Sequence, residues 1–258
     1  MTITLEFLGT GTSGGVPIIG CQCEVCTSPD AHDARLRSSA MLHVDGTYLL
    51  VDTSPDLRQQ LLRSTPPRID AVLYTHMHSD HTAGIDDVRP FNYRQEERIP
   101  VWMPENAVED FQRRFGYTLE PIRHRYGVVP NLDLHVIDAA QPFEVAGVQV
   151  TPIPVMHGRL PILGYRVGDV AYLTDILSLP PESEPLLRGL DVLVTTALKK
   201  EENPGHMSLF QALDLVEHIG PKRAYLSHVG HELGREREIA PLLPDHVQLA
   251  YDGLTIES

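Results

Sequence analysis

The sequence predicts an α/β protein in which two mixed β-sheets pack face to face with helices outside them. Three observations favour this fold class. Short apolar segments typical of strands recur in both halves of the chain, helix-like segments are interspersed among them, and no linker, repeat or low-complexity tract divides the series. We therefore expect a single domain over residues 1–258, long enough to bury a sizeable core.

The expected strands are runs of alternating or continuously apolar residues. They cover residues 2–8, 39–44, 48–52, 70–74, 99–104, 132–137, 143–154, 162–167, 170–174, 192–195, 224–227 and 247–251. The first strand ends in a loop with four glycines, residues 9–15, which lacks the Gly-Lys-Ser/Thr ending of a nucleotide-binding loop. Between the second and third strands, Asp45-Gly46 is a strong hairpin signal.

Helices are expected between these strands. One begins at Ser54, a cap residue followed by proline, and Leu57, Leu61 and Leu62 give it an apolar face. Others cover residues 208–218 and 235–243. We interpret residues 105–130 as a surface helix and loop with solvated charges. This stretch contains the only concentration of positive charge, at Arg113, Arg114, Arg123, His124 and Arg125.

Composition excludes several classes of function. The formal net charge is −14 and no basic stripe is present, so polymeric nucleic acid is a poor partner. No segment approaches the ~20 apolar residues of a membrane span. The first residues lack the features of a signal peptide. We expect a cytoplasmic protein that acts on a small molecule, with neither a nucleic-acid polymer nor a membrane as partner.

The run Tyr74-Thr-His-Met-His-Ser-Asp-His81 is the most informative segment, because three histidines and one aspartate fall within six residues. It follows an expected buried strand, and strand ends are where α/β proteins place their chemistry. His76 and His78 alternate along an extended segment and can reach one ion, whereas Asp80 and His81 follow a turn and face a second. Imidazole and carboxylate ligands suit zinc, iron, manganese and other divalent ions.

Three later residues, His157, Asp175 and His228, each stand at the end of an expected apolar strand. Each of them alone could be a capping or core residue. Their common placement is the argument for a shared role. Together with the three histidines and the aspartate of 76–81, they complete seven ligands for two metal ions.

With these residues the chain resembles the metallo-β-lactamase superfamily, in which a His-x-His-x-Asp-His signature is followed by distant His, Asp and His ligands. The resemblance implies an αββα sandwich with a dinuclear site at one edge of the two sheets. It assigns His76, His78 and His157 to one ion, Asp80, His81 and His228 to the other, and Asp175 to a bridging position. Two such ions lower the pKa of a bridging water, so that hydroxide exists near neutral pH.

All three cysteines lie within residues 21–26, and an odd, crowded set does not form a normal disulfide framework. Cys21, Cys23 and Cys26 offer three thiolates, and a tetrahedral zinc needs a fourth ligand. His231 is the candidate, because it lies three residues past His228. With four ligands and no open position, this zinc would be structural, held by an insertion at about residues 20–27.

Within the superfamily, a Cys-x-Cys-x-x-Cys insertion after a Gly-Thr-Gly-Thr-Ser-x-Gly loop resembles the PhnP-like phosphodiesterases, accessory enzymes of the carbon–phosphorus lyase pathway. This resemblance implies hydrolysis of a small phosphodiester, of the cyclic ribosyl type, with manganese or zinc as the two catalytic ions. It is also compatible with a homodimer.

His206 lies in a loop before an expected helix, where it could overhang the metal ions. In PhnP-like enzymes a histidine in this Gly-His-x-Ser setting is the general acid for the leaving alkoxide, and imidazolium can donate a proton near neutral pH. Asp80 would also orient the hydroxide. We interpret the remaining histidines as structural or surface residues, and these are His32, His43, His124, His135, His218 and His246.

Alternative functions stay open. A thioester or lactone hydrolase of the same fold would use the same hydroxide, which also attacks carbonyl carbon. A PqqB-like cofactor-biosynthesis protein would share the cysteine insertion, although PqqB has a degraded metal motif and this chain has all seven ligands. Transfer-RNA 3′-processing enzymes share the seven ligands, but this chain lacks their basic arm and is strongly acidic.

Overall fold

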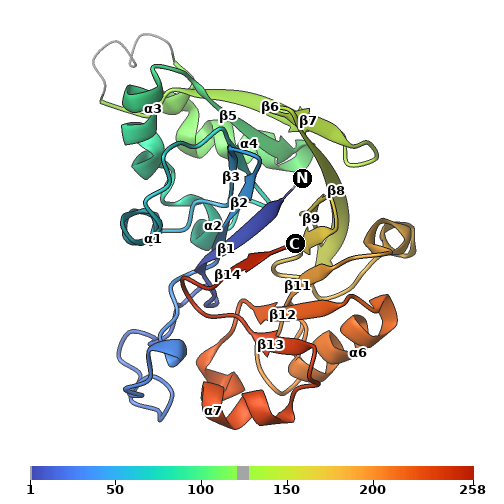
Figure 1. Ribbon diagram of the computed structural model, residues 1–258. Coiled ribbons are helices and arrows are strands. Elements are labelled where there is room, and N and C mark those ends of the chain that lie inside the picture. The colour runs from blue at the N-terminus through green and yellow to red at the C-terminus, as the bar shows by residue number, and fades with distance from the viewer. Residues whose placement is uncertain (1, 121–127) are drawn as a thin grey trace.

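Two seven-stranded sheets form the centre of the molecule in the computed structural model, which describes residues 2–120 and 128–258 (Figure 1). One sheet has the order β14 (Thr255–Glu257), β1 (Ile3–Gly9), β2 (Ser39–Val44), β3 (Thr47–Val51), β4 (Ala71–Leu73), β5 (Ile99–Pro104) and β6 (Leu132–Ile137). The other has the order β13 (Val247–Leu249), β12 (Arg223–Ser227), β11 (Val192–Thr196), β10 (Val170–Tyr172), β9 (Leu160–Val167), β8 (Val148–His157) and β7 (Phe143–Val145).

Both sheets are mixed, and they repeat one pattern. In the first sheet the neighbours from β3 to β6 run parallel and those from β14 to β3 run antiparallel. In the second sheet the neighbours from β10 to β13 run parallel and those from β7 to β10 run antiparallel. Parallel strands present their carboxyl ends at a common edge, which is where α/β proteins bind ligands.

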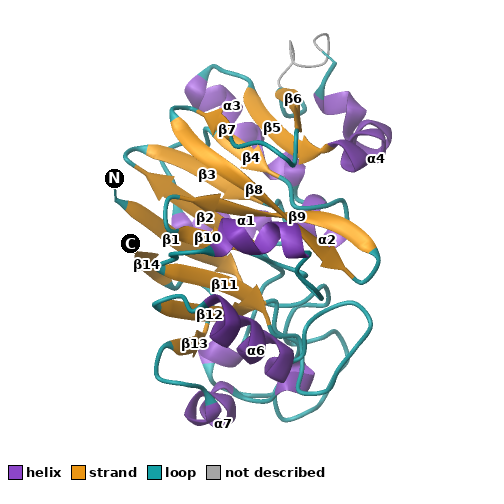
Figure 2. Ribbon diagram, turned by 90° about the vertical axis from the view of Figure 1, so that its right-hand side faces the viewer, coloured by secondary structure: helices purple, strands orange, loops and turns teal. Residues whose placement is uncertain are grey.

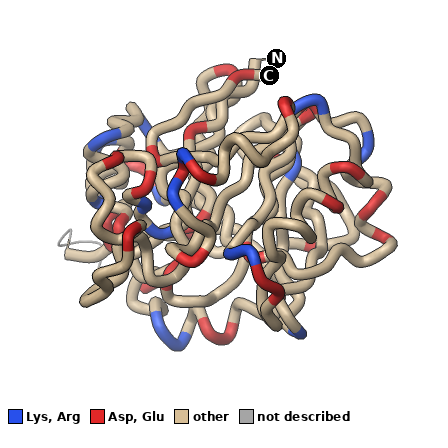
Figure 3. Tube along the Cα trace, turned by 90° about the horizontal axis from the view of Figure 1, so that it is seen from below, with Lys and Arg blue, Asp and Glu red and all other residues tan. Residues whose placement is uncertain are grey.

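Helices cover the outer faces of the sheets (Figure 2). They are α1 (Leu57–Ser64), α2 (Ser79–Thr82), α3 (Arg89–Gln95), α4 (Glu105–Phe115), α6 (Leu209–Ile219) and α7 (Glu236–Ile239). Among the described residues, no helix is both long and apolar enough to span a membrane. In the view of Figure 3, acidic and basic residues are interspersed along the chain.

Three apolar clusters account for this layering. The cluster between the sheets contains Phe7 of β1 and Tyr165 of β9, both with no exposed surface. A second cluster joins the first sheet to α1 and α4, for example through Phe111. The third joins the other sheet to α6 and α7, for example through Val216. Because successive residues of a strand point to opposite faces, one strand contributes to two clusters, and the predicted sandwich with helices outside is confirmed.

The predicted helix at Ser54 begins later than expected. It starts at Leu57, because Ser54 forms a preceding turn in which its hydroxyl accepts from the Asp56 N–H and donates to Gln60 Oε1. The predicted apolar face was wrong in one member, since Leu57 is buried but Leu62 is 61% exposed.

The segment 105–130, predicted as a surface helix and loop, opens with the three-turn helix α4. Its positive charges were interpreted as solvated. Arg113 is solvated as predicted, since its side chain is 75% exposed. The prediction is wrong for Arg114, whose side chain is 28% exposed and donates to Met77 and Thr82. Arg123, His124 and Arg125 lie outside the described residues.

Two strand assignments also differ from expectation. The predicted strand 143–154 is a hairpin of β7 and β8, with Ala146 and Gly147 both at positive φ in its turn. The short strand β14 was not predicted. It pairs antiparallel with β1 and so joins the end of the chain to its start.

Candidate metal centres

The seven predicted ligands come from strand ends that meet at one edge of the sandwich. His76 and His78 follow β4, and Asp80 and His81 lie in the short helix α2. The others lie at the ends of strands of the second sheet, where His157 is the last residue of β8, Asp175 follows β10 and His228 follows β12 directly.

The structure brings these side chains together in overlapping groups whose ligand atoms lie within 4.8 Å of one another. The groups are His76, His78 and His157; His76, His81 and Asp175; and Asp80, Asp175 and His228. Asp175 has a central position, since its Oδ2 atom lies 3.1 Å from His81 Nε2 and 3.2 Å from His228 Nδ1. His81 Nε2 also lies 3.3 Å from Asp80 Oδ2. The cluster is therefore one continuous site rather than two separate ones.

The donor atoms fit metal ions. Among the described residues, the Nε2 atoms of His76, His81 and His228 are buried without a hydrogen-bond partner. The Nδ1 atoms of His76 and His81 lie beside Thr75 and Asp52, and His157 Nδ1 lies 2.7 Å from the carbonyl oxygen of Gly205. An imidazole held through Nδ1–H presents its Nε2 lone pair to the site, which is how histidines bind metal in proteins. A buried nitrogen left without a partner costs free energy unless an ion is bound there.

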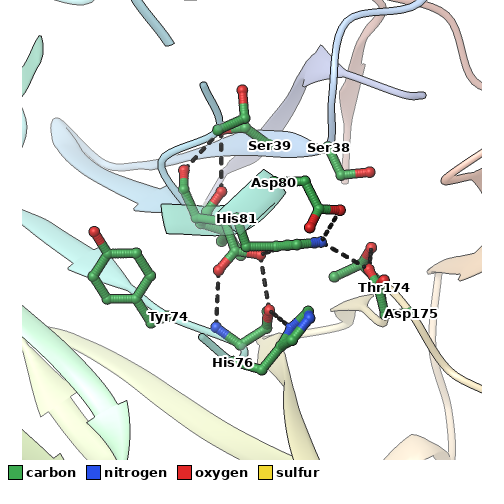
Figure 4. Close-up of polar contacts among 12 residues, drawn as sticks. Ser38, Ser39, Tyr74, His76, Asp80, His81, Thr174 and Asp175 are labelled. Atoms are coloured by element: carbon green, nitrogen blue, oxygen red, sulfur yellow. Dashed lines mark hydrogen bonds and ion pairs between the residues drawn. The ribbon is translucent and has the colours of Figure 1, made fainter. Parts of the chain in front are cut away.

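Asp52 supports two of these histidines and was missed in the sequence. Its carboxylate accepts hydrogen bonds from the N–H (2.9 Å) and the hydroxyl (2.8 Å) of Thr75, and it lies 2.6 Å from His81 Nδ1. Figure 4 shows His81 beside Asp80 and Asp175. The Thr75 hydroxyl in turn lies 2.9 Å from His76 Nδ1. Asp52 therefore orients His81 directly and His76 through Thr75. The sequence could have pointed to Asp52 through its position directly after β3, which matches the position of Asp175 after β10.

Backbone strain is concentrated at this site. Among the described residues, seven other than glycine have positive φ, and three of them are Asp52 (60°), Asp175 (57°) and His228 (53°). The left-handed conformation costs a non-glycine residue roughly 1–2 kcal/mol. Such strain persists where the surrounding structure fixes the residue, and it is typical of functional sites.

The protonation states suit a cationic ligand. Burial lowers the pKa of His228 to about 4 and that of His76 well below its usual value, so both imidazoles are neutral. Burial alone would raise the pKa of Asp175, but His228 and His81 hold it well below the usual value, and the carboxylate is ionised. Burial alone would lower the pKa of His81, but Asp175 and Asp52 raise it well above the usual value. The neutral imidazoles of His76 and His228 beside the ionised carboxylate of Asp175 are donors of the kind that zinc, manganese and iron sites use.

Arg114 of α4 holds the loop that carries the first histidines. Its guanidinium donates to the carbonyl oxygen of Met77 and, at 2.9 Å, to the hydroxyl of Thr82. Both acceptors lie within or beside the metal-ligand motif. The role of this arginine was not apparent in the sequence, because only the folded chain places α4 against this loop.

His206 lies at the edge of the cluster, as its loop position suggested. Its Nε2 atom is 3.1 Å from Asp175 Oδ1, and its ring centroid is 4.4 Å from that of His157. The loop is held by Asn203, whose Oδ1 accepts the N–H groups of Gly205 and His206. His206 is therefore a fixed neighbour of the seven residues and not a mobile surface side chain.

The cysteines form a second centre with His231, which the sequence proposed as the fourth ligand. His231 Nδ1 lies 3.4, 3.3 and 3.4 Å from the sulfur atoms of Cys21, Cys23 and Cys26. In a tetrahedral zinc site, ordinary bond lengths place a sulfur and a nitrogen about 3.6 Å apart. The backbone N–H of Cys26 lowers the pKa of the Cys23 thiol to about 6, which favours a thiolate there. This S₃N arrangement could hold a structural metal ion.

The two centres are joined by the segment 228–231. Val229 N–H donates to the carbonyl oxygen of Thr10 at 2.8 Å, and Gly230 N–H donates to that of Leu198 at 2.9 Å. The Ser38 hydroxyl lies 2.9 Å from His228 Nδ1 and donates to the carbonyl oxygen of Gly11. The glycine-rich loop therefore packs beside the metal cluster.

The histidines interpreted as structural or surface residues have such surroundings where the structure describes them. His32 stacks on Tyr251, His43 on Tyr48 and His135 on Trp102. His124 lies outside the described residues.

Similarity to known proteins agrees with this geometry. Residues 47–229 match the family described as the beta-lactamase superfamily domain. A diphosphatase of the PhnP family has a solved structure with 41% sequence identity and a TM-score of 0.92, and the match covers 100% of this chain and 98% of that one. Zinc-bound PqqB from Methylobacterium extorquens has a TM-score of 0.78 at 20% identity, over 98% of this chain and 99% of that one, which shows a shared fold alone.

Among curated sequences, an octanoyltransferase of Porphyromonas gingivalis is 39% identical over 249 residues, which is 96% of this chain and 50% of that protein. The PqqB protein of a Methylobacterium species is 39% identical over 122 residues, 40% of each chain. The chain thus spans about half the length, or less, of these curated relatives.

Proposed function

Because the chain belongs to the metallo-β-lactamase superfamily, we propose that it is a metal-dependent phosphodiesterase that hydrolyses a small phosphodiester, of the cyclic ribosyl type. The observation that carries this proposal is the buried cluster in which histidine Nε2 atoms and two carboxylates converge beside His206. The similarity to a PhnP-family diphosphatase over the whole chain supports hydrolysis of a phosphorus–oxygen bond.

In this proposal His76, His78 and His157 hold one ion, Asp80, His81 and His228 hold the other, and Asp175 is shared. When bound, two divalent ions would activate water near neutral pH and neutralise the charge of the phosphate. Manganese and zinc both suit the donor set. Asp80 would also orient the attacking water. Its Oδ2 atom lies 3.3 Å from His81 Nε2, so both side chains face the same part of the cluster.

His206 is the proposed general acid. Its Nε2 atom lies 3.1 Å from Asp175 Oδ1, so that a proton on this nitrogen is held at the rim of the cluster. The side chain is 18% exposed, and a substrate at the rim can therefore reach it. A general acid is needed most where the leaving group is a poor one, such as an alkoxide.

The cysteine centre has a structural role in this account. Cys21, Cys23, Cys26 and His231 would hold one zinc ion with no open position, because all four tetrahedral ligands come from the protein. The segment 20–27 is then an insertion within one domain over residues 1–258 rather than a separate unit.

The test is a hydrolysis assay on protein stripped of metal and refilled with manganese or zinc. Bis(p-nitrophenyl) phosphate, 2′,3′-cyclic nucleotides and a ribosyl cyclic phosphate are compared with a thioester and a lactone. Phosphodiester turnover that returns with metal supports the proposal. Turnover of the thioester or lactone alone would instead favour a carbonyl hydrolase of the same fold, and a cluster that takes up no metal would favour a PqqB-like role.

A further inference from the structure

A cavity of about 610 Å³ lies between α1 and α3, and no predicted metal ligand lines it. Both helices pack on the first sheet through the same apolar cluster, so the cavity belongs to the outer layer of the molecule. Its volume falls within the roughly 300–1,000 Å³ of pockets that take small organic ligands. The cavity is therefore a candidate for a second site, separate from both metal centres.

The floor of this cavity is apolar. Leu61 and Phe91 line it and are 9% and 5% exposed, as members of the cluster beneath α1. Leu62 lines the same cavity but is 61% exposed. An apolar ligand in the cavity would cover Leu62 and remove this surface from water. The leucine that the core does not bury thus lies where a ligand would contact it.

Three arginines, Arg58, Arg89 and Arg94, line the same cavity. In the part of the chain that the structure describes, none of them forms an ion pair with a carboxylate. Arg89 donates to the carbonyl oxygen of Val128 at 2.7 Å, and Arg94 donates to that of Pro67 at 2.9 Å. A guanidinium group carries five N–H donors, so each arginine keeps donors for a ligand.

The charge of the lining is positive. Among the described residues of the lining, Asp87 is the only acidic one. Burial raises the pKa of Asp87, and the charges of Arg58 and Arg89 act against this shift, so both guanidinium groups face the space around Asp87. The adjacent Asp86 does not line the cavity, and its carboxylate accepts from the Tyr117 hydroxyl at 2.9 Å. Three positive charges against one negative charge favour an anion here, although the formal net charge of the chain is −14.

The walls of the cavity are fixed to each other. Gly84 lies just before the turn Ile85–Val88, and its N–H donates to the carbonyl oxygen of Thr53 at 2.9 Å. The backbone approaches so closely that a Cβ atom on Gly84 would lie 2.0 Å from the carbonyl oxygen of Ser54. The turn that carries Asp87 is therefore held against the start of α1. A preformed cavity costs a ligand less ordering free energy than one that must first assemble.

We propose that this cavity binds a small amphiphilic anion, whose anionic group contacts the arginines while its apolar body covers Leu62. Guanidinium groups form their strongest hydrogen bonds with ionised acceptors such as carboxylate and phosphate. A small anion meets only the positively charged lining. An extended anionic surface, such as a membrane or a nucleic acid, would meet the whole acidic chain and be repelled.

Isothermal titration of the metal-loaded protein with three probes tests the proposal. Octyl sulfate carries an apolar chain and a negative charge, octyl glucoside carries the same chain without the charge, and inorganic sulfate carries the charge without the chain. Each is used below the concentration at which it forms micelles. We expect octyl sulfate to bind at least about 10-fold more tightly than either of the others, as for one charged hydrogen bond. Equal binding of octyl sulfate and octyl glucoside, or no binding of octyl sulfate, would overturn the proposal.

Two variants locate the bound probe. Leu62→Asp has Leu242→Asp as its matched control, because Leu242 is a leucine of similar exposure, 64%, in another part of the chain. Arg58→Gln has Arg113→Gln as its control, at a side chain that is 75% exposed on α4. We expect Leu62→Asp and Arg58→Gln each to weaken octyl sulfate binding about 10-fold, and the controls to leave it unchanged. Unchanged binding in both Leu62→Asp and Arg58→Gln would show that the probe binds elsewhere, and would overturn the proposal.

A second copy of the chain is the other occupant that could cover Leu62. Analytical ultracentrifugation compares the unmodified protein with Leu62→Asp. The same oligomeric state in both supports a site that is open to a small ligand, whereas a dimer that dissociates in Leu62→Asp would overturn the proposal. None of these measurements requires turnover, so they hold whether or not the protein hydrolyses phosphodiesters.

Discussion

The two candidate metal centres are built in opposite ways. The histidine and aspartate cluster takes its side chains from the ends of β4, β8, β10 and β12. Contacts with the Asp52 carboxylate, the Thr75 hydroxyl and the Gly205 carbonyl oxygen fix the orientation of its histidines. The cysteine centre takes three ligands from residues 21–26, which lie outside any helix or strand. The fourth ligand, His231, is more than 200 residues further along the chain. The two sheets hold the ligands of the first centre in place. In the second centre, the bound ion would itself stabilise the loop that carries the cysteines.

We therefore expect one centre to support activity and the other to support stability. Losing a side chain of the strand-end cluster should remove activity and leave the fold, because the strands that carry it are held by large apolar clusters. Losing the cysteine centre should weaken the fold around it, because none of residues 17–30 is buried. Metal sites that close a loop contribute their binding free energy to folding.

The largest expected effect is that of Asp175→Ala. This side chain is common to both halves of the cluster, and its removal should lower phosphodiester turnover by about 10³-fold, the range seen when one strong electrostatic contact to a reacting group is lost. The measurement is kcat on bis(p-nitrophenyl) phosphate, with circular dichroism to verify the fold. Activity within a few-fold of wild type would contradict the shared role.

Asp52→Asn should have an intermediate effect. The amide can still accept from the Thr75 N–H, but it removes the charge that faces His81 Nδ1. Loss of such an outer partner typically costs 10–100-fold in metal affinity or activity. Metal content and turnover are measured together on the same sample. If both stay at wild-type values, orientation of His81 and His76 does not depend on Asp52.

Cys23→Ser probes the other centre. We expect it to release the zinc of the cysteine site and to lower Tm by roughly 4–8 °C, which corresponds to about 2 kcal/mol in a chain of this size class. The control is Gln22→Ala, at an exposed position between two of the cysteines on the same loop. A normal Tm after loss of that metal ion would show that the loop is organised without it.

The smallest expected effect is that of Arg114→Ala compared with Arg113→Ala. Arg114 donates to Met77 and Thr82 in the metal-ligand motif, while Arg113 contacts only Asp110 among the described residues. We expect a several-fold loss of metal affinity for the first variant and little change for the second. Isothermal titration with manganese distinguishes them, and equal affinities would remove the positioning role of Arg114.

Most of the layered fold was predictable, because buried strands appear as apolar runs and the Asp45-Gly46 turn has a specific sequence. The prediction of two packed sheets is confirmed. The convergence of His157, Asp175 and His228 was also predictable, since each follows an apolar run. The pairing of His231 with distant cysteines was predictable from the need of tetrahedral zinc for a fourth ligand.

The features that sequence did not reveal are contacts between elements. The roles of Asp52, Ser38 and Arg114 depend on which strand ends and helices become neighbours, and no local pattern encodes that. The late start of α1 at Leu57 is a local effect, because the turn at Ser54 competes with the helical cap. β14 is too short for its periodicity to be visible.

The most direct test of the central claim is a metal titration of the stripped protein, with phosphodiester turnover and bound metal measured at each step. The account predicts that the first equivalent of zinc raises Tm without turnover, and that hydrolysis of bis(p-nitrophenyl) phosphate appears as the next two equivalents fill the strand-end cluster. Filling of all three positions with no phosphodiester turnover, or turnover that does not depend on metal, would contradict it.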